Sequence, residues 1–307
     1  MQDDRTPLVR EALRWFVRLR DDEVTEAEQR AFESWRRQSS EHEAAWDRAC
    51  HLWAALAPVE KEFAQRRRSA IGRRAVIGSG LGALLAGAVG AWALGDGFLA
   101  DFRTGTPERR SFVLADGSRL ELNSHSAVSE HYTARERRLV LHHGEAFFTV
   151  AADASRPFVV EAGEGTVRAL GTQFNVDMVD EMVTVTVAEH GVEIALRGGD
   201  TERLEAGWQL AYAQRRFPAS ARPVAPATTA SWRQGRLVYH DVALRRVLRD
   251  FERQGGGIIV LMDDGLASRT VSASFDIDRI DAALDTIVSS LPARLVRIGG
   301  LAVIYPG

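Results

Sequence analysis

The sequence has almost no cysteine: Cys50 is the only one in 307 residues, which excludes an intrachain disulfide. Lysine is equally scarce, since Lys61 is the only one and every other basic residue is arginine. The net charge of −3 gives no reason to expect a nucleic-acid partner. Residues 1–7 are polar and acidic, so no signal peptide is expected there. The chain is long enough for two or three globular domains.

One uncharged stretch, residues 75–94, has the length that a helix needs to cross a bilayer, about 20 apolar residues. Acidic residues follow it, and a cluster of arginines precedes it: Arg66, Arg67, Arg68, Arg73 and Arg74. The positive-inside rule then places residues 1–74 in the cytoplasm and 96–307 outside. We predict a single-pass protein of the bacterial inner membrane, with a cytoplasmic N-terminus and a periplasmic C-terminus. The alternative is a buried helix of a soluble domain.

The predicted span is rich in glycine, and Gly78 and Gly82 form a GxxxG pair. Such a pair can bring two membrane helices together. The glycines also lower helix propensity, which would suit a helix that unwinds for an intramembrane protease. A third interpretation is that they simply fit a short span, and the sequence leaves all three open.

Residues 1–60 are predicted to form three amphipathic helices. In the first, Leu8, Ala12 and Trp15 begin one apolar face. The second and third start with the capping-box patterns of residues 25–28 and 40–43. The tryptophans either pack in a small core or contact a partner. Because no catalytic or metal-ligand set accompanies them, this unit is predicted to be a binding module.

The spacing of the aromatic residues in this unit resembles the N-terminal domain of FecR-type anti-sigma regulators. In that family the domain binds an extracytoplasmic-function sigma factor. The resemblance implies that five residues contact the sigma factor: Trp15, Phe32, Trp35, Trp46 and Trp53. Residues 61–74 would form a basic juxtamembrane segment, and 95–109 a stalk on the outer side.

Residues 110–217 contain many short alternating strands with glycine turns and no helical period. This pattern predicts an all-β periplasmic domain, either a sandwich or a solenoid-like stack. Asp116-Gly117 marks the turn of a hairpin. Two separate strands are expected at 138–142 and 146–150.

Four motifs here resemble the FecR periplasmic domain: LADGS with LN, HGEAFF, RPF and GTQFNV. An inserted His190 departs from the family pattern. We interpret the motifs as structural. Their residues are Asp116, Gly117, Ser118, Asn123, Gly144, Glu145, Phe148, Pro157, Phe158, Gly171, Thr172 and Phe174.

The Gly171-Thr172 bond has a second interpretation. If the turn is strained, the threonine hydroxyl can attack the glycine carbonyl in an N-to-O acyl shift, and hydrolysis of the ester then cuts the chain. Some members of the family are thought to self-cleave at this bond. Otherwise we expect no enzyme activity and no cofactor. The histidines at 125, 131, 142 and 143 lack the companions of a metal site.

Residues 218–231 are rich in proline, alanine and threonine and are interpreted as a linker. Residues 232–307 predict a small α+β domain with helices at 242–254 and 280–291. This unit resembles the secretin/TonB short N-terminal domain at the end of FecR-type proteins. The resemblance implies a periplasmic partner, the signalling domain of a TonB-dependent outer-membrane transducer.

The hypothesis is therefore a transmembrane anti-sigma regulator of cell-surface signalling, often linked to iron uptake in the family. It would hold the sigma factor at the membrane and release it after cuts by periplasmic and intramembrane proteases. The sequence does not give the sign of regulation. The alternatives are a membrane-anchored envelope scaffold without a sigma partner and an outward-facing hydrolase, for which no nucleophile and base are found.

Overall fold

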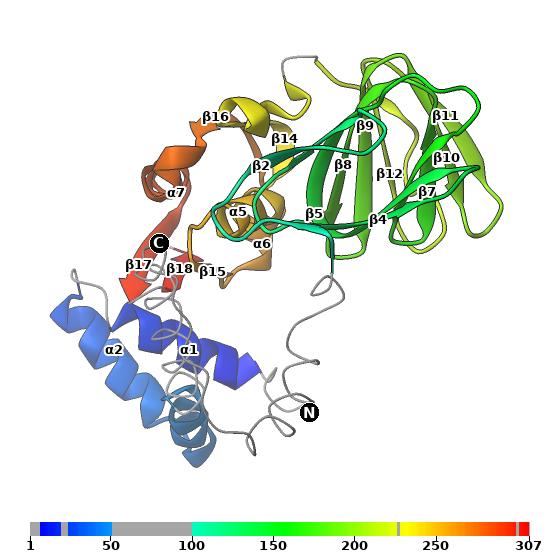
Figure 1. Ribbon diagram of the computed structural model, residues 1–307. Helices are drawn as coiled ribbons and strands as arrows, with labels where there is room; N and C mark the ends of the chain where they lie inside the picture. Colours follow the sequence, from blue (N-terminus) through cyan, green and yellow to red (C-terminus); the bar gives the residue numbers. More distant parts are fainter. Residues whose placement is uncertain (1–6, 20–23, 51–99, 226–227, 299–300, 307) are drawn as a thin grey trace, which may run out of the picture.

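The computed structural model describes residues 7–19, 24–50, 100–225, 228–298 and 301–306 (Figure 1). No helix within these ranges is long and apolar enough to cross a membrane. The predicted span at 75–94 and the arginines before it lie outside the described residues. The coarse prediction of a multidomain chain, α-helical and then β-rich, is confirmed.

The N-terminal helices are α1 (Pro7–Arg18), α2 (Glu26–Arg36) and a helix over residues 40–50. Thr25 caps α2 in the predicted capping box, since its Oγ1 accepts from the Glu28 amide at 3.3 Å and its own amide donates to the Glu28 carboxylate at 2.9 Å. The predicted cap at Ser40 is wrong by one residue. The Ser39 hydroxyl accepts from the amides of residues 41 and 42, at 3.2 and 3.4 Å, so the helix begins at Ser40.

The β domain consists of thirteen strands that form one continuous sheet folded into two layers. The first layer contains β1 (Phe102–Arg103), β4 (Ala127–Tyr132), β5 (Arg137–Thr149), β6 (Phe158–Ala162), β7 (Gly165–Ala169), β10 (Gly191–Leu196) and β11 (Thr201–Glu205). The second layer contains β2 (Arg110–Val113), β3 (Arg119–Leu122), β8 (Gln173–Val179), β9 (Met182–Glu189), β12 (Trp208–Tyr212) and β13 (Arg222–Pro223). β13 lies inside the predicted linker and pairs with β12.

Strand β5 belongs to both layers and changes layer at Gly144. Residues before Gly144 pair with β4 and β6, and residues from Gly144 onward pair with β3 and β8. Gly144 has a φ of +88°, which a residue without a Cβ adopts easily. The prediction of two separate strands here is wrong, because this glycine lets the chain bend without leaving the sheet.

The two layers enclose one apolar core. Leu120, Phe148 and Phe174 come from the second layer, and Val160 and Ile194 from the first. All five are fully buried. A shared core between two layers corresponds to the sandwich rather than the solenoid-like stack.

The C-terminal unit packs two helices with two small sheets around one core. The two-stranded sheet is β14 (Arg236–Ala243) with β16 (Thr270–Asp276), and the three-stranded sheet is β15 (Ile258–Leu261), β18 (Leu301–Pro306) and β17 (Ala293–Ile298). The helices are α5 (Leu244–Arg253) and α7 (Ile280–Ser289), as predicted to within two residues. A short helix, α6 (Asp264–Ala267), and two 3₁₀ turns, η2 (Ser231–Gln234) and η3 (Ile277–Arg279), were not predicted.

Two contacts place the C-terminal unit in the molecule. It lies against the second layer of the β domain, on the side of β2, β5 and β8 (Figure 1). Helix α1 contacts its three-stranded sheet, where Val17 shares an apolar cluster with Val296, Val303 and Tyr305.

Candidate functional site

The outer face of the second layer is covered by the C-terminal unit, so this sheet is buried on both faces. Along β5, Ala146 and Phe148 point into the sandwich core, whereas Phe147 belongs to the core of the C-terminal unit. Because successive side chains of a strand alternate, Glu145 lies on the same outer face as Phe147. The HGEAFF motif therefore supplies residues to two different interfaces.

An apolar and aromatic contact forms one part of this interdomain surface. Phe147 is only 1% exposed and packs in the same cluster as Trp232. The Arg233 guanidinium lies 3.9 Å from the centre of the Phe147 ring, and it also contacts the Glu121 carboxylate at 2.6 Å. Arg109 completes the contact by donating to the Trp232 carbonyl at 3.0 Å.

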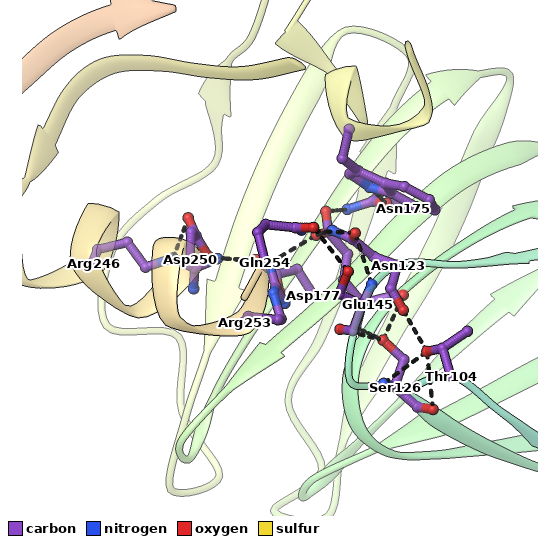
Figure 2. Close-up of polar contacts among 12 residues, drawn as sticks. Thr104, Asn123, Ser126, Glu145, Asn175, Asp177, Arg246, Asp250, Arg253 and Gln254 are labelled. Atoms are coloured by element: carbon purple, nitrogen blue, oxygen red, sulfur yellow. Dashed lines mark hydrogen bonds and ion pairs between the residues drawn. The ribbon is translucent and has the colours of Figure 1, made fainter. Parts of the chain in front are cut away.

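A network of buried charges forms the second part, at the end of α5 (Figure 2). Arg253 lies within 2.9 Å of both Glu145 of β5 and Asp177 of β8, and within 3.0 Å of Asp250 on its own helix. Arg246 pairs with Asp177 and, at 3.1 Å, with Asp250. The side chains of Arg253 and its three carboxylate partners are each no more than 11% exposed.

Amide and hydroxyl groups connect the same surfaces. Gln254 donates to the Asn123 carbonyl oxygen Oδ1 and accepts from the Ser124 hydroxyl, both at 2.8 Å. The side-chain amides of Asn123 and Asn175 donate to the two oxygens of Glu145 at 2.7 and 2.9 Å. We call Asn123, Glu145, Asn175 and Asp177 the motif face, since three of them fall within the LN, HGEAFF and GTQFNV motifs and Asp177 follows two residues after Asn175.

The network carries three carboxylates against two guanidinium groups, and this imbalance shifts the pKa values. Burial, followed by the nearby Asp177, raises the pKa of Glu145 to about 7, while Arg253 and Asn123 act in the opposite direction. The pKa of Asp177 is lowered: burial would raise it, but Arg246 and Arg253 outweigh that effect. Within the described residues, no group of three or more His, Cys, Asp or Glu side chains is placed to hold a metal ion.

A second buried ion pair lies inside the β domain. Arg137 is 0% exposed and its Nη1 lies 2.7 Å from Asp116 Oδ2. The same guanidinium donates to the carbonyls of Arg156 and Ala151 at 2.9 Å. Burial raises the pKa of Asp116, but hydrogen bonds from Ser118 and Arg137 bring the pKa below its usual value. Asp116 thus fixes the hairpin turn and also joins it to the RPF loop.

The Gly171-Thr172 bond lies at the start of β8. Gly171 has a φ of +148°, and a Cβ there would lie 3.3 Å from Ala152 Cα. Thr172 is 4% exposed, and its hydroxyl oxygen has no hydrogen-bond partner among the described residues. The Thr172 carbonyl accepts from the Val150 amide at 3.0 Å, which anchors the residue to the end of β5.

The other predicted site residues separate into distinct groups. Phe32 and Trp35 lie in the core of the helical domain at 8% and 4% exposure, whereas Trp15 and Trp46 are half-buried. Trp53 lies outside the described residues. Phe148, Phe158 and Phe174 are sandwich core, and Pro157 accepts from the Arg137 amide at 3.0 Å. Gly117 adopts a φ of +84° in its turn.

The predicted site omitted the basic residues that join these motifs: Arg137, Arg246, Arg253 and the neighbouring Gln254. One signal was available on α5, where Arg246, Asp250 and Arg253 follow at i, i+4 and i+7. That stripe lies opposite the apolar residues Leu244, Val247 and Phe251 of the same helix. A polar stripe alone does not show whether water or another domain faces it.

The architecture is that of a helical N-terminal domain, a β sandwich and a small α+β unit docked on the sandwich. The family model described as FecR protein matches residues 100–193, and a domain of unknown function, DUF4880, matches residues 10–52. The resemblance to FecR-type regulators is therefore confirmed, and residues 100–193 are a FecR domain. No curated protein matches the chain.

Crystal structures of a candidate anti-sigma factor from Parabacteroides distasonis ATCC 8503 are similar in fold to about two thirds of this chain. The structure at 1.65 Å resolution is 25% identical, with a TM-score of 0.62, and the alignment covers 67% of this chain and 98% of the other. The structure at 2.50 Å resolution gives a TM-score of 0.61 at the same identity and coverage.

Proposed function

We propose that this chain is an anti-sigma regulator, whose N-terminal helices bind a sigma factor and whose FecR and C-terminal domains receive the signal. The observation that carries the proposal is the alignment of 67% of the chain with a candidate anti-sigma factor, together with the FecR match. The N-terminal helices add support, because they carry half-buried aromatic residues that a partner could contact.

The sigma factor would contact aromatic residues that keep exposed surface, namely Trp15 and Trp46. Trp15 and Trp46 pack against the edge of the cluster in which Phe32 and Trp35 are buried, so we assign Phe32 and Trp35 to the fold. The test is co-purification of endogenous sigma factors with the detergent-solubilised full chain. A Trp15→Ala, Trp46→Ala double variant should lose the sigma factor while the chain stays helical. Recovery of no sigma factor by the folded wild-type chain would favour the scaffold alternative.

Residues 75–94 would anchor the chain in the inner membrane, with the FecR domain in the periplasm. The five arginines before the span and the two aspartates after it support this orientation. Contact of Val17 with Val296 and Tyr305 requires both on one side of the membrane, so it is incompatible with the spanning arrangement. Alkaline phosphatase fused after Gly307 distinguishes the spanning arrangement from one in which α1 and the C-terminal unit lie on the same side of the membrane. Activity is expected, and an inactive, cytoplasmic fusion would contradict this topology.

The periplasmic partner would be the signalling domain of a TonB-dependent transducer, bound through the C-terminal domain. Among the described strands β16 pairs only with β14, so its other edge can accept a partner strand. The response would proceed through a periplasmic cut and an intramembrane cut that free the sigma-binding domain. If deleting the transducer gene abolished the inducible release of the sigma-binding domain from the membrane, this sequence of events would be supported.

Self-cleavage at Gly171-Thr172 would prepare the chain for this response. The Thr172 hydroxyl would attack the Gly171 carbonyl carbon, the C–N bond would break, and the hydroxyl proton would pass to the released amine. Water would then hydrolyse the ester to a Gly171 carboxylate and restore the hydroxyl. Two observations support the proposal: the Thr172 hydroxyl has no hydrogen-bond partner in the described part of the chain, and Gly171 has a positive φ.

Intact mass spectrometry of the purified chain tests the cleavage. Two fragments are expected from the wild type and from Thr172→Ser, and a single chain from Thr172→Val, which keeps the shape but removes the nucleophile. An uncut wild-type chain would show that the buried hydroxyl has only a structural role.

A further inference from the structure

We propose that the end of α5 is a reversible latch, and that its opening is the conformational step by which the C-terminal domain passes its signal to the FecR domain. This inference deepens the proposed regulator function and rests on it for its biological meaning. The latch consists of Arg246, Asp250 and Arg253 on α5, of Gln254 directly after this helix, and of the motif face on the β domain.

The chemistry of the two surfaces favours reversible contact. The motif face presents asparagine and carboxylate side chains, and α5 presents arginine, aspartate and glutamine. All of these groups are well solvated when exposed, so opening uncovers little apolar surface at the latch itself. The apolar surface that domain separation must uncover lies at the neighbouring contact of Phe147 with Trp232. The sandwich core is different, because it is built from Leu, Val, Ile and Phe and cannot open without unfolding.

The latch is specific in geometry but incompletely compensated in charge. Two guanidinium groups face three carboxylates, and Arg253 Nε has no partner within the described residues. Removing paired charges from water is costly, and the mutual attraction offsets that cost only when every group is satisfied. The latch therefore defines one docked orientation while contributing little net free energy, a combination that a binding partner can overcome.

The position of the latch connects it to the rest of the molecule. Asp177 and Asn175 lie on β8, the strand that begins one residue after Thr172. Trp232 Nε1 donates to Asn175 at 3.4 Å, and Arg246 and Arg253 hold Asp177. Movement of the C-terminal domain thus acts directly on β8 and on Glu145 of β5, the paired strands at the centre of the second layer.

The experiment measures domain separation in the solubilised full chain. Spin labels are attached at Arg119→Cys of β3 and Arg279→Cys, two exposed positions on opposite sides of the interface, in a Cys50→Ser background. Arg253→Gln should raise the separated population by about tenfold or more, since charged hydrogen bonds are lost. Arg245→Ala is the matched control, because its partner Asp264 is 87% exposed and away from the latch, and it should change nothing.

Hydrogen exchange on the same proteins decides what has opened. Faster exchange confined to α5 and to the amides beneath the motif face, with slow exchange retained in the sandwich core, would support the latch. An unchanged distance distribution in Arg253→Gln would overturn it. Unfolding of the sandwich in both Arg253→Gln and Glu145→Gln would also overturn it, because docking would then be inseparable from folding. Neither readout depends on a sigma factor, so failure of the proposed function would be seen separately.

Discussion

Arg253 of α5 and Glu145 of β5 form an ion pair of 2.9 Å across two domains, although 108 residues separate them in the chain. Both side chains are at most 10% exposed. Glu145 also accepts from two asparagine amides, so both of its oxygens face hydrogen-bond donors. The glutamate of a family motif is thereby placed at the junction between the FecR domain and the C-terminal domain.

Removing Arg253 should destabilise the chain more than neutralising Glu145. Arg253→Gln leaves three carboxylates with only Arg246, and we expect a loss of about 1.5–3 kcal/mol, because opening of the latch returns these carboxylates to water. Glu145→Gln removes one negative charge from a site with an excess of them. Urea unfolding of both single variants and the double variant should give a coupling energy of about 0.5–3 kcal/mol. Equal costs for the two single variants, with no coupling, would contradict a buried pair.

Arg137 should be far more important for stability than its neighbour Arg138. Arg137→Met abolishes the buried pair with Asp116 and the bonds to two carbonyls, and we expect a loss of about 3–5 kcal/mol. Arg138 pairs with Glu136 and Glu161 while 34% exposed, so Arg138→Met should cost about 1 kcal/mol or less. Denaturant unfolding of the two variants measures the difference. Comparable losses would mean that the Asp116 pair does not organise this region.

Asp116 and Arg137 show which parts of the fold could be predicted from the sequence and which could not. The hairpin around Asp116-Gly117 follows from local chemistry, since glycine accepts a positive φ and the flanking residues alternate. The pairing of Asp116 with Arg137 depends on strands that meet only in the folded sheet. Alternation along β5 places Arg137 on the same face as Leu139 and Leu141, but it does not identify Asp116 as the partner of a buried arginine there.

The motif face illustrates the same limit at the level of domains. Alternation along β5 and β8 indicates which residues leave the sandwich core. It does not indicate whether water or another domain lies beyond, and the sequence alone therefore supports only a structural interpretation of the motifs. The helices and strands of the C-terminal unit were predictable from their period. Its docking on Glu145 and Phe147 was not, because docking is decided by two surfaces together.

Two glycines with similar φ values should respond differently to substitution by alanine. Gly144 and Gly117 have φ values of +88° and +84°. A Cβ on Gly144 would lie 2.3 Å from Ser126 Oγ and 2.5 Å from the His125 carbonyl oxygen, whereas a Cβ on Gly117 meets nothing within 4 Å. Gly117→Ala should therefore cost about 1 kcal/mol from backbone strain alone. Gly144→Ala should cost several times more, because β5 can no longer change layers without moving Ser126.

Soluble yield and the midpoint of urea unfolding measure the loss of stability in both glycine variants. The urea midpoint and the soluble yield should be highest for the wild type, somewhat lower for Gly117→Ala and much lower for Gly144→Ala. Equal midpoints for the two variants would show that the bend in β5 tolerates a side chain, and that the close approach to Ser126 relaxes at little cost.

His143 should make the chain less stable as the pH falls below neutrality. Burial, with smaller effects from His125 and His142, lowers the pKa of this half-buried side chain from 6.5 to about 4. The folded protein therefore binds the proton less well than the unfolded chain. The contribution of His143 is complete above pH 6.5 and is lost progressively between pH 6.5 and 4.

His143→Gln should remove this part of the acid sensitivity. Glu145 acts in the opposite direction, because its raised pKa adds stability as the pH falls from about 7 to 4.5. Only the difference between variant and wild type therefore isolates the histidine. Between pH 7.5 and pH 5, the variant should lose less free energy of unfolding in urea than the wild type, by about 1 kcal/mol or less because the ring is partly exposed. A variant that loses as much stability on acidification as the wild type would show that protonation of His143 is not coupled to folding.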